Sequence, residues 1–270
     1  MELFDIKGRV IVITGGYGIL GSSMARCLAH AGAHVVIVGR NEEKGQALVK
    51  ELTAAGTEAL FCQADVLDRE QLEKAKEDIL AKFGHLDVLI NAAGGNMPGA
   101  TIAPGQTIFD LNMEHFAKVT DLNLNGTVLP TLVFAGEMVR QKKGSVINVS
   151  SMSAQGVITR VVGYSAAKAA IDNFTRWMAV EMAKKFGEGI RVNAIAPGFF
   201  LTEQNRTLLT NPDGSWTDRA KDVIRATPFG RMGEPDELNG AIIYLASDAS
   251  KFVTGTVLPI DGGFSIFSGV

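Results

Sequence analysis

Short apolar runs alternate along this chain with longer segments whose apolar residues recur at helical spacing. The runs are rich in β-branched residues, which is typical of buried parallel strands. They predict strands at 9–14, 33–38, 57–62, 86–90, 145–150, 190–195 and 256–260. The segments between them predict one helix that ends at His30 and further helices at 42–55, 68–83, 113–140, 164–186 and 234–247. This alternation predicts an α/β fold with a parallel sheet covered on both faces.

The chain shows no shift in composition and no linker along its 270 residues. An α/β fold of roughly 250 residues commonly forms a single domain, so we expect one domain over 1–270. Within it, 199–231 is a long polar insertion after the sixth predicted strand. Because a long loop beside a site often serves as a lid, we expect a substrate loop at about 199–231.

Composition and charge argue against several classes of partner. Apolar residues make up 46% of the chain and charged residues 20%, which is typical of a soluble globular protein. The net charge of −3, without a basic run, gives no basis for binding nucleic acid, and no apolar run could span a membrane. Cys27 and Cys62 lie in apolar segments and predict buried thiols in a reducing cytoplasm. The four histidines are scattered without metal-ligand spacing, so we expect no metal site.

The segment from Asn148 to Lys168 carries the residues most suited to chemistry. Tyr164 and Lys168 are four residues apart in a predicted helix, so their side chains lie on one face. A free phenol has a pKa near ~10, and a nearby cation is expected to lower it, so that the phenol can exchange a proton with a substrate oxygen. Ser151 ends the preceding strand, where its hydroxyl could bond the same oxygen. Taken alone, the pair is also consistent with an amphipathic surface, and Ser150-Ser151 with a turn or helix cap.

A glycine-rich turn follows the first predicted strand. Gly15, Gly18 and Gly21 lie between that strand and the first helix. At the head of a βαβ unit, such a turn lets backbone N–H groups face the pyrophosphate of a dinucleotide, and the helix N-terminus adds partial positive charge. A tight structural turn is the alternative interpretation.

The residues after the second predicted strand bear on the choice of dinucleotide. An acidic residue there would bind the ribose 2′-hydroxyl of NAD(H), and an arginine would accept the 2′-phosphate of NADP(H). The chain has Arg40 and Asn41 at this point and no carboxylate, which favours NADP(H). Tyr17 in the glycine-rich turn offers no second cation, and Arg40 can also be interpreted as a solvated loop charge.

Small and polar residues also follow the third and fourth predicted strands. Asp65 and Val66 stand where an adenine ring would lie, and the Asn-Ala-Ala-Gly sequence at 91–94 allows the backbone to approach a cofactor closely. In an open α/β sheet, ligands bind outside the carboxyl ends of the strands. These motifs and Ser151 all lie at such ends, so they predict a common site.

Taken in order along the chain, these motifs resemble those of the short-chain dehydrogenase/reductase family. The matching positions are the turn over 14–21, Asp65, Asn91-Ala92-Ala93-Gly94, Asn123, Ser151, Tyr164, Lys168, Pro197-Gly198 and Asp261-Gly262-Gly263. The resemblance covers nearly the whole chain and implies a Rossmann-type, doubly wound sheet of seven parallel strands with helices on both faces. It also implies an NAD(P)-dependent oxidoreductase that transfers hydride between nicotinamide and a carbonyl or secondary alcohol, assembled as a homotetramer or homodimer.

The same resemblance assigns roles to individual residues. Tyr164 would be the general acid/base, and Lys168 would lower its pKa and bind the nicotinamide ribose. Ser151 would position the substrate oxygen, and Asn123 would hold a water of the proton relay. The residues implied to bind the cofactor are Gly15, Tyr17, Gly18, Ile19, Leu20, Arg40, Asn41, Asp65, Val66, Asn91, Ala92, Ala93, Gly94, Tyr164, Lys168, Pro197, Gly198 and Thr202. One departure is Ile19, where the family usually has glycine, with Gly18 one position earlier instead.

Two loop sequences bear on the substrate. Gly-Gly-Asn-x-Pro at 94–98 and Asn-Pro-Asp-Gly-Ser at 211–215 resemble the D-mannonate oxidoreductase (D-fructuronate reductase) branch of the family. Under that resemblance the reaction is the reversible reduction of a keto sugar acid to D-mannonate. An arginine would suit the substrate carboxylate, because a guanidinium fork matches that anion. The candidate substrate residues are Asn96, Ser153, Arg160, Gln204 and Arg206.

Two other functions stay open at this point. The first is reduction of another carbonyl compound, such as a 3-oxoacyl thioester or a ketogluconate; an acyl-carrier partner would favour a basic patch, which the sequence does not show. The second is a dinucleotide-binding scaffold without turnover. A decayed member would lose the tyrosine or lysine first, whereas Asn123, Ser151, Tyr164 and Lys168 are all present.

Overall fold

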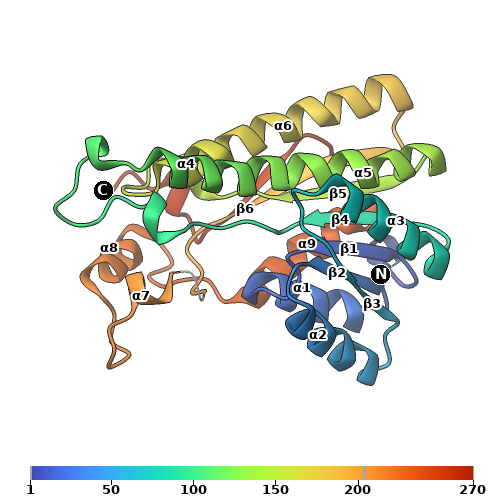
Figure 1. Cartoon of the computed structure of the whole chain (residues 1–270), viewed down its shortest axis with the longest axis horizontal. Helices are drawn as coiled ribbons and strands as arrows, with labels where there is room; N and C mark the ends of the chain where they lie inside the picture. The colour runs from blue at the N-terminus through green and yellow to red at the C-terminus, as the bar shows by residue number, and fades with distance from the viewer. Residues whose placement is uncertain (1, 203–204, 270) are drawn as a thin grey trace.

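A parallel β-sheet forms the centre of the molecule, with helices on both sides (Figure 1). The computed structural model describes residues 2–202 and 205–269. Within them the strands are β1 (Val10–Thr14), β2 (His34–Gly39), β3 (Ala59–Gln63), β4 (Val88–Asn91), β5 (Gly144–Val149), β6 (Ile190–Pro197) and β7 (Val257–Ile260). They form a 7-stranded sheet in the order β3-β2-β1-β4-β5-β6-β7, and every neighbouring pair is parallel. The predicted Rossmann-type, doubly wound sheet is confirmed.

Two layers of helices cover the sheet (Figure 1). The helices are α1 (Ile19–His30), α2 (Glu42–Ala54), α3 (Arg69–Phe83), α4 (Met113–Thr120), α5 (Gly126–Gln141), α6 (Val162–Phe186), α7 (Arg206–Leu209), α8 (Asp218–Ala226) and α9 (Asn239–Ala246). Residues of α1, α2 and α9 share one apolar core with the sheet, and residues of α3, α5 and α6 share the other. Such coverage of both faces explains why the strands are mostly apolar.

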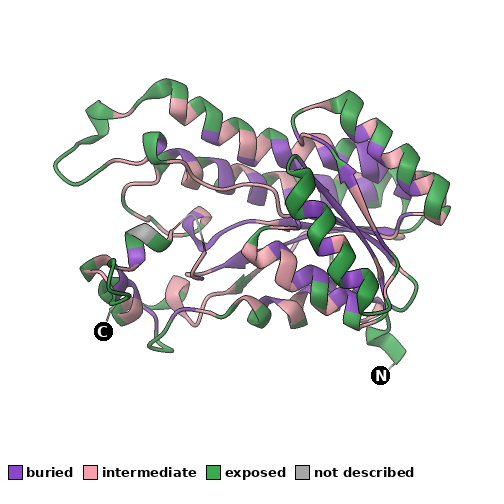
Figure 2. Cartoon of the chain, turned by 60° about the horizontal axis from the view of Figure 1, so that its bottom comes forward, coloured by how far each residue is buried: buried purple, intermediate pink, exposed green. Residues whose placement is uncertain are grey.

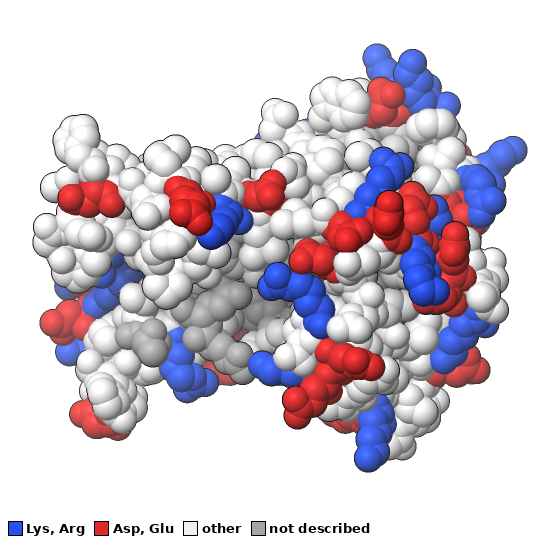
Figure 3. All heavy atoms as spheres, viewed as in Figure 1, with Lys and Arg blue, Asp and Glu red and all other residues white. Residues whose placement is uncertain are grey.

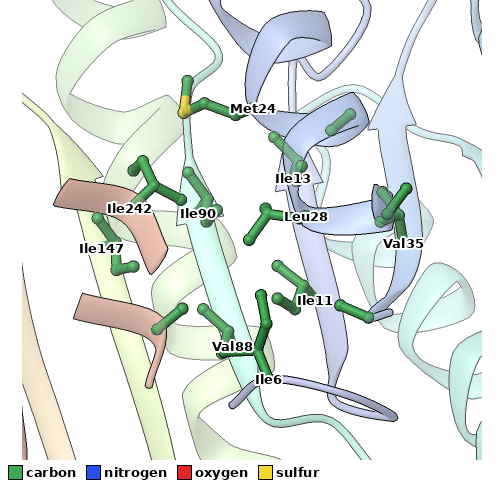
Figure 4. Packing of buried hydrophobic residues seen from close by; sticks show 14 of the residues in the cluster. Ile6, Ile11, Ile13, Met24, Leu28, Val35, Val88, Ile90, Ile147 and Ile242 are labelled. Atoms are coloured by element: carbon green, nitrogen blue, oxygen red, sulfur yellow. The ribbon is translucent and has the colours of Figure 1, made fainter. Parts of the chain in front are cut away.

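Successive strand residues point to opposite cores. On β1, Ile11 and Ile13 pack with Met24 and Leu28 of α1, as Figure 4 shows, while Val10 and Val12 belong to the core on the other face. All four β1 side chains are 0% exposed, and the strands form the buried centre of the molecule in Figure 2. Burying one such side chain contributes roughly 1.5–3 kcal/mol. The sheet is therefore a rigid base for the loops at its edge.

Two predicted elements differ from the structure. The predicted helix at 113–140 is interrupted between α4 and α5 by a π-helical turn, Asp121–Asn125. The insertion at 199–231 contains α7 and α8, which share a small apolar cluster made by Leu209, Ala220, Val223 and Met232. Thr217 caps α8, and Ala220 and Val223 are buried on one face of the helix, so the interpretation of this segment as a polar loop was wrong.

Helix length, candidate metal ligands and surface charge can be described for residues 2–202 and 205–269. No helix among them combines the length and apolar character needed to cross a membrane. They contain no group of three or more histidine, cysteine or acidic side chains that could hold a metal ion. On the face shown in Figure 3, basic and acidic side chains are interspersed and do not gather by sign. This face therefore lacks the basic stripe that marks a nucleic-acid site.

Candidate active site

A cleft of about 780 Å³ opens at the carboxyl ends of the strands. Its lining includes 17–21, 39–40, 64–66, 92–98, 101–104, 149–153 and 197–200, together with Tyr164 and Lys168. Segments that follow β1 through β6 thus meet in one cavity. This is the position at which open α/β sheets bind ligands.

The glycine-rich turn forms the inner wall of the cleft. Gly15 has a φ of +65°, and a Cβ there would lie 2.8 Å from the Cα of Ala93. A Cβ on Gly21 would lie 2.7 Å from the backbone oxygen of Gly15. Helix α1 begins after Gly18, which offers no side-chain cap, so the first amides of the helix have no side-chain acceptor. Such a helix N-terminus, open to the cleft, suits the pyrophosphate of a dinucleotide.

Ile19, the departure from the family pattern, is the first residue of α1 and lines the cleft together with Leu20. Because the glycine before it closes the turn, with the Gly18 amide donating to the oxygen of Gly15 at 3.0 Å, the helix still starts at the cleft. The altered glycine spacing leaves the predicted anion site open.

Tyr17 organises the end of β2. Its hydroxyl accepts hydrogen bonds from the backbone amides of Arg40 and Asn41, both at 3.1 Å. The Arg40 guanidinium lies 3.5 Å from the Asp65 carboxylate. Arg40, Asp65 and Tyr17 line the cleft, whereas Asn41 accepts from the Lys44 amide and caps α2 outside it.

Asn91 also lies outside the cleft lining, although it was predicted to contact the cofactor. Its side chain is buried and donates to Thr131 at 2.8 Å and to Asn148 at 2.9 Å. Asn148 in turn donates to Thr175 at 2.9 Å. This polar chain joins β4 and β5 to α5 and α6. The residues that follow, Ala92-Ala93-Gly94, line the cleft, as do Val66, Pro197-Gly198 and Thr202.

The structure brings Ser151, Tyr164 and Lys168 together in the cleft. The Ser151 side chain is hydrogen-bonded to the Tyr164 phenol. The Nζ atom of Lys168 lies 5.4 Å from the centre of the Tyr164 ring and donates to the backbone oxygen of Val149 at 2.7 Å. The predicted juxtaposition of phenol, ammonium and hydroxyl is therefore present.

The electrostatics differ from the expectation. Burial raises the pKa of the Tyr164 phenol, and the hydrogen bond with Ser151 opposes this by less. Burial sets the direction because it disfavours the phenolate, and the lowering expected from the Lys168 ammonium is not among the causes of the shift. Burial also lowers the pKa of Lys168 to about 8, opposed by the charge of Asp172. The resting phenol carries its proton, and the lysine titrates close to neutrality.

Asp172 is a residue of this site that the sequence reasoning missed. It is buried beside Lys168, accepts a hydrogen bond from the Ser150 hydroxyl, and has its pKa raised mainly by burial. Tyr164, Lys168 and Asp172 follow one another at intervals of four along α6. That spacing places all three on one helical face and could have revealed the third member.

Asn123 lies in the π-helical turn and braces the loop after β4. Its side-chain oxygen accepts from the Gly95 amide at 3.0 Å, and its nitrogen donates to the Gly95 oxygen at 2.7 Å. A Cβ on Gly94 would lie 2.7 Å from the Asn123 side-chain oxygen and 3.5 Å from Lys168 Nζ. Asn123 is therefore next to the lysine but outside the cleft lining. A π-turn at such a position is typical of functional sites.

The predicted substrate residues separate into two groups. Asn96, Ser153 and Arg160 line the cleft. Arg206 is exposed on α7 and lies outside the lining, and Gln204 lies outside the described residues. The arginine that α8 contributes to the cleft is Arg219, which the expectation of a polar loop at 199–231 does not single out.

Comparison with known proteins identifies the family. A family model described as Enoyl-(Acyl carrier protein) reductase matches residues 17–265. The Bacillus subtilis oxidoreductase UxuB, described as uncharacterized, is 50% identical, with 98% of each chain covered. The chain belongs to the short-chain dehydrogenase/reductase family. The predicted enzyme class is confirmed: the protein is an oxidoreductase of that family, which acts on alcohol and carbonyl groups.

Solved short-chain dehydrogenase/reductase structures share the whole fold. A Haemophilus influenza protein with a provisional D-mannonate oxidoreductase assignment, solved with bound NAD, has a TM-score of 0.92 and 42% identity, with 98% of each chain covered. A gluconate 5-dehydrogenase from Burkholderia cenocepacia, solved with NADP and tartrate, has a TM-score of 0.87 and 34% identity, also with 98% of each chain covered. Members of the family with this architecture thus take either dinucleotide.

Proposed function

We propose that this oxidoreductase interconverts a keto sugar acid and its hydroxy acid with NAD(P)(H), and that D-fructuronate and D-mannonate are the natural pair. The observation that carries this proposal is that Ser151, Tyr164 and Lys168 share one cleft with arginine side chains. The loop sequences at 94–98 and 211–215, and the provisional assignment of the Haemophilus relative, support the choice of sugar acid. A polyhydroxy acid offers both the anion and the hydroxyls that such a lining can bind.

The dinucleotide fits residues of the inner cleft. The open N-terminus of α1 would receive the pyrophosphate, Lys168 the nicotinamide ribose, and Pro197-Gly198 with Thr202 the nicotinamide. When bound, the nicotinamide would supply or accept the hydride. We further propose a preference for NADP(H), because Arg40 places a guanidinium after β2 where no carboxylate stands.

The chain's own residues handle the proton. In the reducing direction, the protonated Tyr164 phenol donates to the substrate carbonyl oxygen, and the Ser151 hydroxyl hydrogen-bonds the same oxygen. The ammonium of Lys168, held by the Val149 oxygen, stabilises the phenolate that this transfer leaves. In the oxidising direction the phenol must first lose its proton, which its raised pKa disfavours near neutrality. Near neutrality the resting phenol is therefore the proton donor that reduction needs. Asn123 remains our proposed anchor for the relay water.

We propose that 199–231 acts as a lid within a single domain over 1–270. The two ends of the segment lie side by side, since the Gly233 amide donates to the Phe199 oxygen at 2.9 Å. Its helices α7 and α8 have an apolar cluster of their own, and Leu208 and Arg219 line the cleft. A segment that is closed at its base and packed internally can move as a unit over a substrate.

The test is turnover on a panel of carbonyl compounds. Absorbance of the reduced nicotinamide should fall with D-fructuronate and rise with D-mannonate, and should change far less with a 3-oxoacyl thioester or a simple ketone. A ketogluconate in the same panel distinguishes neighbouring sugar acids. Preference for the 3-oxoacyl thioester would contradict the proposal and favour an acyl-chain reductase.

A further inference from the structure

Two arginines from different elements line the cleft close enough for their charges to interact. Arg160 lies just before α6, Arg219 lies on α8, and both line the cavity that contains Ser151 and Tyr164. The guanidinium of Arg219 donates to the hydroxyl and to the backbone oxygen of Thr159, at 3.2 and 3.1 Å. Arg219 is therefore held against the residue that precedes Arg160.

The positive charges of Arg160 and Arg219 interact, and neither guanidinium forms an ion pair with a described carboxylate. Burial and then the positive charge of Arg160 lower the pKa of Arg219, and Asp222 opposes them. Asp222 itself pairs with Arg225 at 2.8 Å on the outer face of α8. Among the described residues that line the cleft, the one carboxylate is Asp65, which follows β3. Two repelling cations beside a cavity favour binding of an anion.

The backbone at Arg160 is strained and is held in place by hydrogen bonds. Its φ of 76° lies in the left-handed region, which is unfavourable for a residue with a side chain. The Arg160 oxygen accepts from the Ile102 amide at 3.0 Å, and Arg219 holds Thr159. Strain of this kind persists where surrounding contacts over-determine it, which is typical of ligand sites. The Arg160 guanidinium makes no hydrogen bond or ion pair with another described residue.

Buried polar atoms without partners lie on the same wall. Ser153 is 5% exposed, and its hydroxyl has no hydrogen-bond partner among the described residues. Asn96 donates to Thr101 at 3.0 Å, but its side-chain oxygen is likewise buried and unpartnered. Both residues line the cleft. Both atoms are shielded from solvent in this structure, so a ligand with hydroxyl groups would reach them only after a side-chain rotation; because buried polar groups are normally hydrogen-bonded, their lack of partners favours that rotation.

We propose that Arg160 and Arg219 together bind the carboxylate of the substrate, and that Ser153 and Asn96 bind hydroxyl groups of the same molecule. This inference rests on the proposed function and assigns the acid specificity of its site. Arg219 takes the role that the sequence suggested for Arg206. A planar carboxylate can accept from both guanidiniums and relieve their repulsion, so recognition depends on the pair.

Paired variants and paired substrates test the subsite. Arg160→Gly removes the guanidinium while glycine accepts the left-handed backbone without strain. Arg219→Lys retains the charge but loses the fork that holds Thr159. The matched controls are Arg225→Ala, on the same helix but outside the cleft, and Arg206→Ala. Melting temperatures of all four variants should stay close to that of the parent protein.

Kinetics on D-fructuronate and on D-fructose, which replaces the carboxylate by CH2OH, separate charge recognition from catalysis. Arg160→Gly should lower kcat/KM for the acid by about 30-fold and leave the neutral ketose within about 3-fold. Arg219→Lys should lower the acid value by about 10-fold, and both controls should leave it unchanged. Equal losses on both substrates, or a loss confined to Arg206→Ala, would overturn the assignment.

Direct binding keeps this test independent of the natural substrate. Calorimetry on the dinucleotide-loaded protein should find that tartrate binds less tightly to Arg160→Gly and Arg219→Lys than to Arg225→Ala. If the parent protein rejects every keto sugar acid, the proposed function fails, yet weaker tartrate binding in both cleft variants still supports the subsite. Unchanged tartrate binding in both would remove the subsite, even if sugar acids are turned over.

Discussion

The Nζ atom of Lys168 donates a hydrogen bond of 2.7 Å to the backbone oxygen of Val149. Val149 ends β5 and Lys168 lies one turn after Tyr164 on α6, so this contact joins the strand that leads to Ser151 with the helix that carries the phenol. Both elements contribute residues to the same apolar core. The proton-transfer groups are therefore held by elements that pack on this core, whereas the proposed substrate-binding groups lie in loops and on the short helix α8.

Replacing the phenol should separate binding from chemistry. In Tyr164→Phe the ring that packs beside Lys168 is retained and the proton donor is lost. We expect kcat for reduction to fall by about 10²- to 10⁴-fold, the usual contribution of a positioned acid or base. Dinucleotide affinity, measured by fluorescence titration, should be nearly unchanged. Full activity in this variant would contradict the assigned role.

The pH profile of reduction should report Lys168. Its pKa of about 8 means that the ammonium is charged below that pH and neutral above it. Because the charge stabilises the phenolate formed from Tyr164, kcat/KM for reduction should be level below pH 8 and fall above it. Alcohol oxidation should instead rise with pH, because it needs the phenolate, whose pKa is raised. A reduction profile that stays level well above pH 8 would exclude this role for the lysine.

The charge of Asp172 should set the pH above which kcat/KM for reduction falls. Its charge raises the pKa of Lys168, so in Asp172→Asn the fall of kcat/KM for reduction should begin at a lower pH. Asparagine keeps an oxygen that can accept from the Ser150 hydroxyl, so the local packing is largely preserved. A melting curve controls for stability. A loss of rate with an unchanged pH dependence of kcat/KM would indicate a purely structural role for the carboxylate.

Use of NADP(H) should depend on Arg40. Arg40→Ala removes the guanidinium and leaves the Asp65 carboxylate, 3.5 Å away in the parent protein, uncompensated beside the ribose site. We expect KM for NADPH to rise about 10- to 100-fold, as for loss of one charge-assisted contact, and KM for NADH to change little. In Arg40→Lys, which keeps the positive charge, KM for NADPH should lie between the values of the parent protein and of Arg40→Ala. Equal effects on both cofactors would show that Arg40 does not read the 2′-phosphate.

The outer helices should mediate self-association. Trp177 and Val180 on α6 are 59% and 56% exposed, and Leu132 on α5 is 50% exposed. Large apolar side chains grouped on such a surface are typical of an interface. Sedimentation velocity should find a homotetramer or homodimer, and Trp177→Glu should shift it toward smaller species. A parent protein that sediments as a monomer at micromolar concentration would refute this expectation.

Much of the fold could be predicted because buried parallel strands are continuous apolar runs. Each predicted strand lies within about two residues of an observed one, from β1 at Val10–Thr14 to β7 at Val257–Ile260. Outside the sheet, the apolar pattern of the sequence is a weaker guide to the elements. The π-turn at Asp121–Asn125 lies inside a run of helical spacing that does not mark its position. Helix α8 does have local signals, a Thr217 cap and the spacing of Ala220 and Val223, but the polar character of the insertion obscured them.

Part of the site was also beyond the reach of sequence. Spacing alone brought Tyr164 and Lys168 together, since residues four apart share a helical face. The direction of the Tyr164 pKa depends on burial, which is a property of the assembled cleft. Arg219 reaches Thr159 across 60 positions of the chain, and this contact exists only after folding. The substrate wall was therefore less predictable than the catalytic helix.

Tyr17 has a consequence for anyone who wishes to redesign cofactor choice. A Cβ at Gly39 would lie 2.4 Å from the Tyr17 ring. An aspartate at Gly39, the last residue of β2, would therefore force the Tyr17 ring to move and would break the hydrogen bonds that its hydroxyl accepts from the Arg40 and Asn41 amides. In this protein the two positions form one engineering unit, so a redesign of selectivity has to treat residues 17 and 39 together.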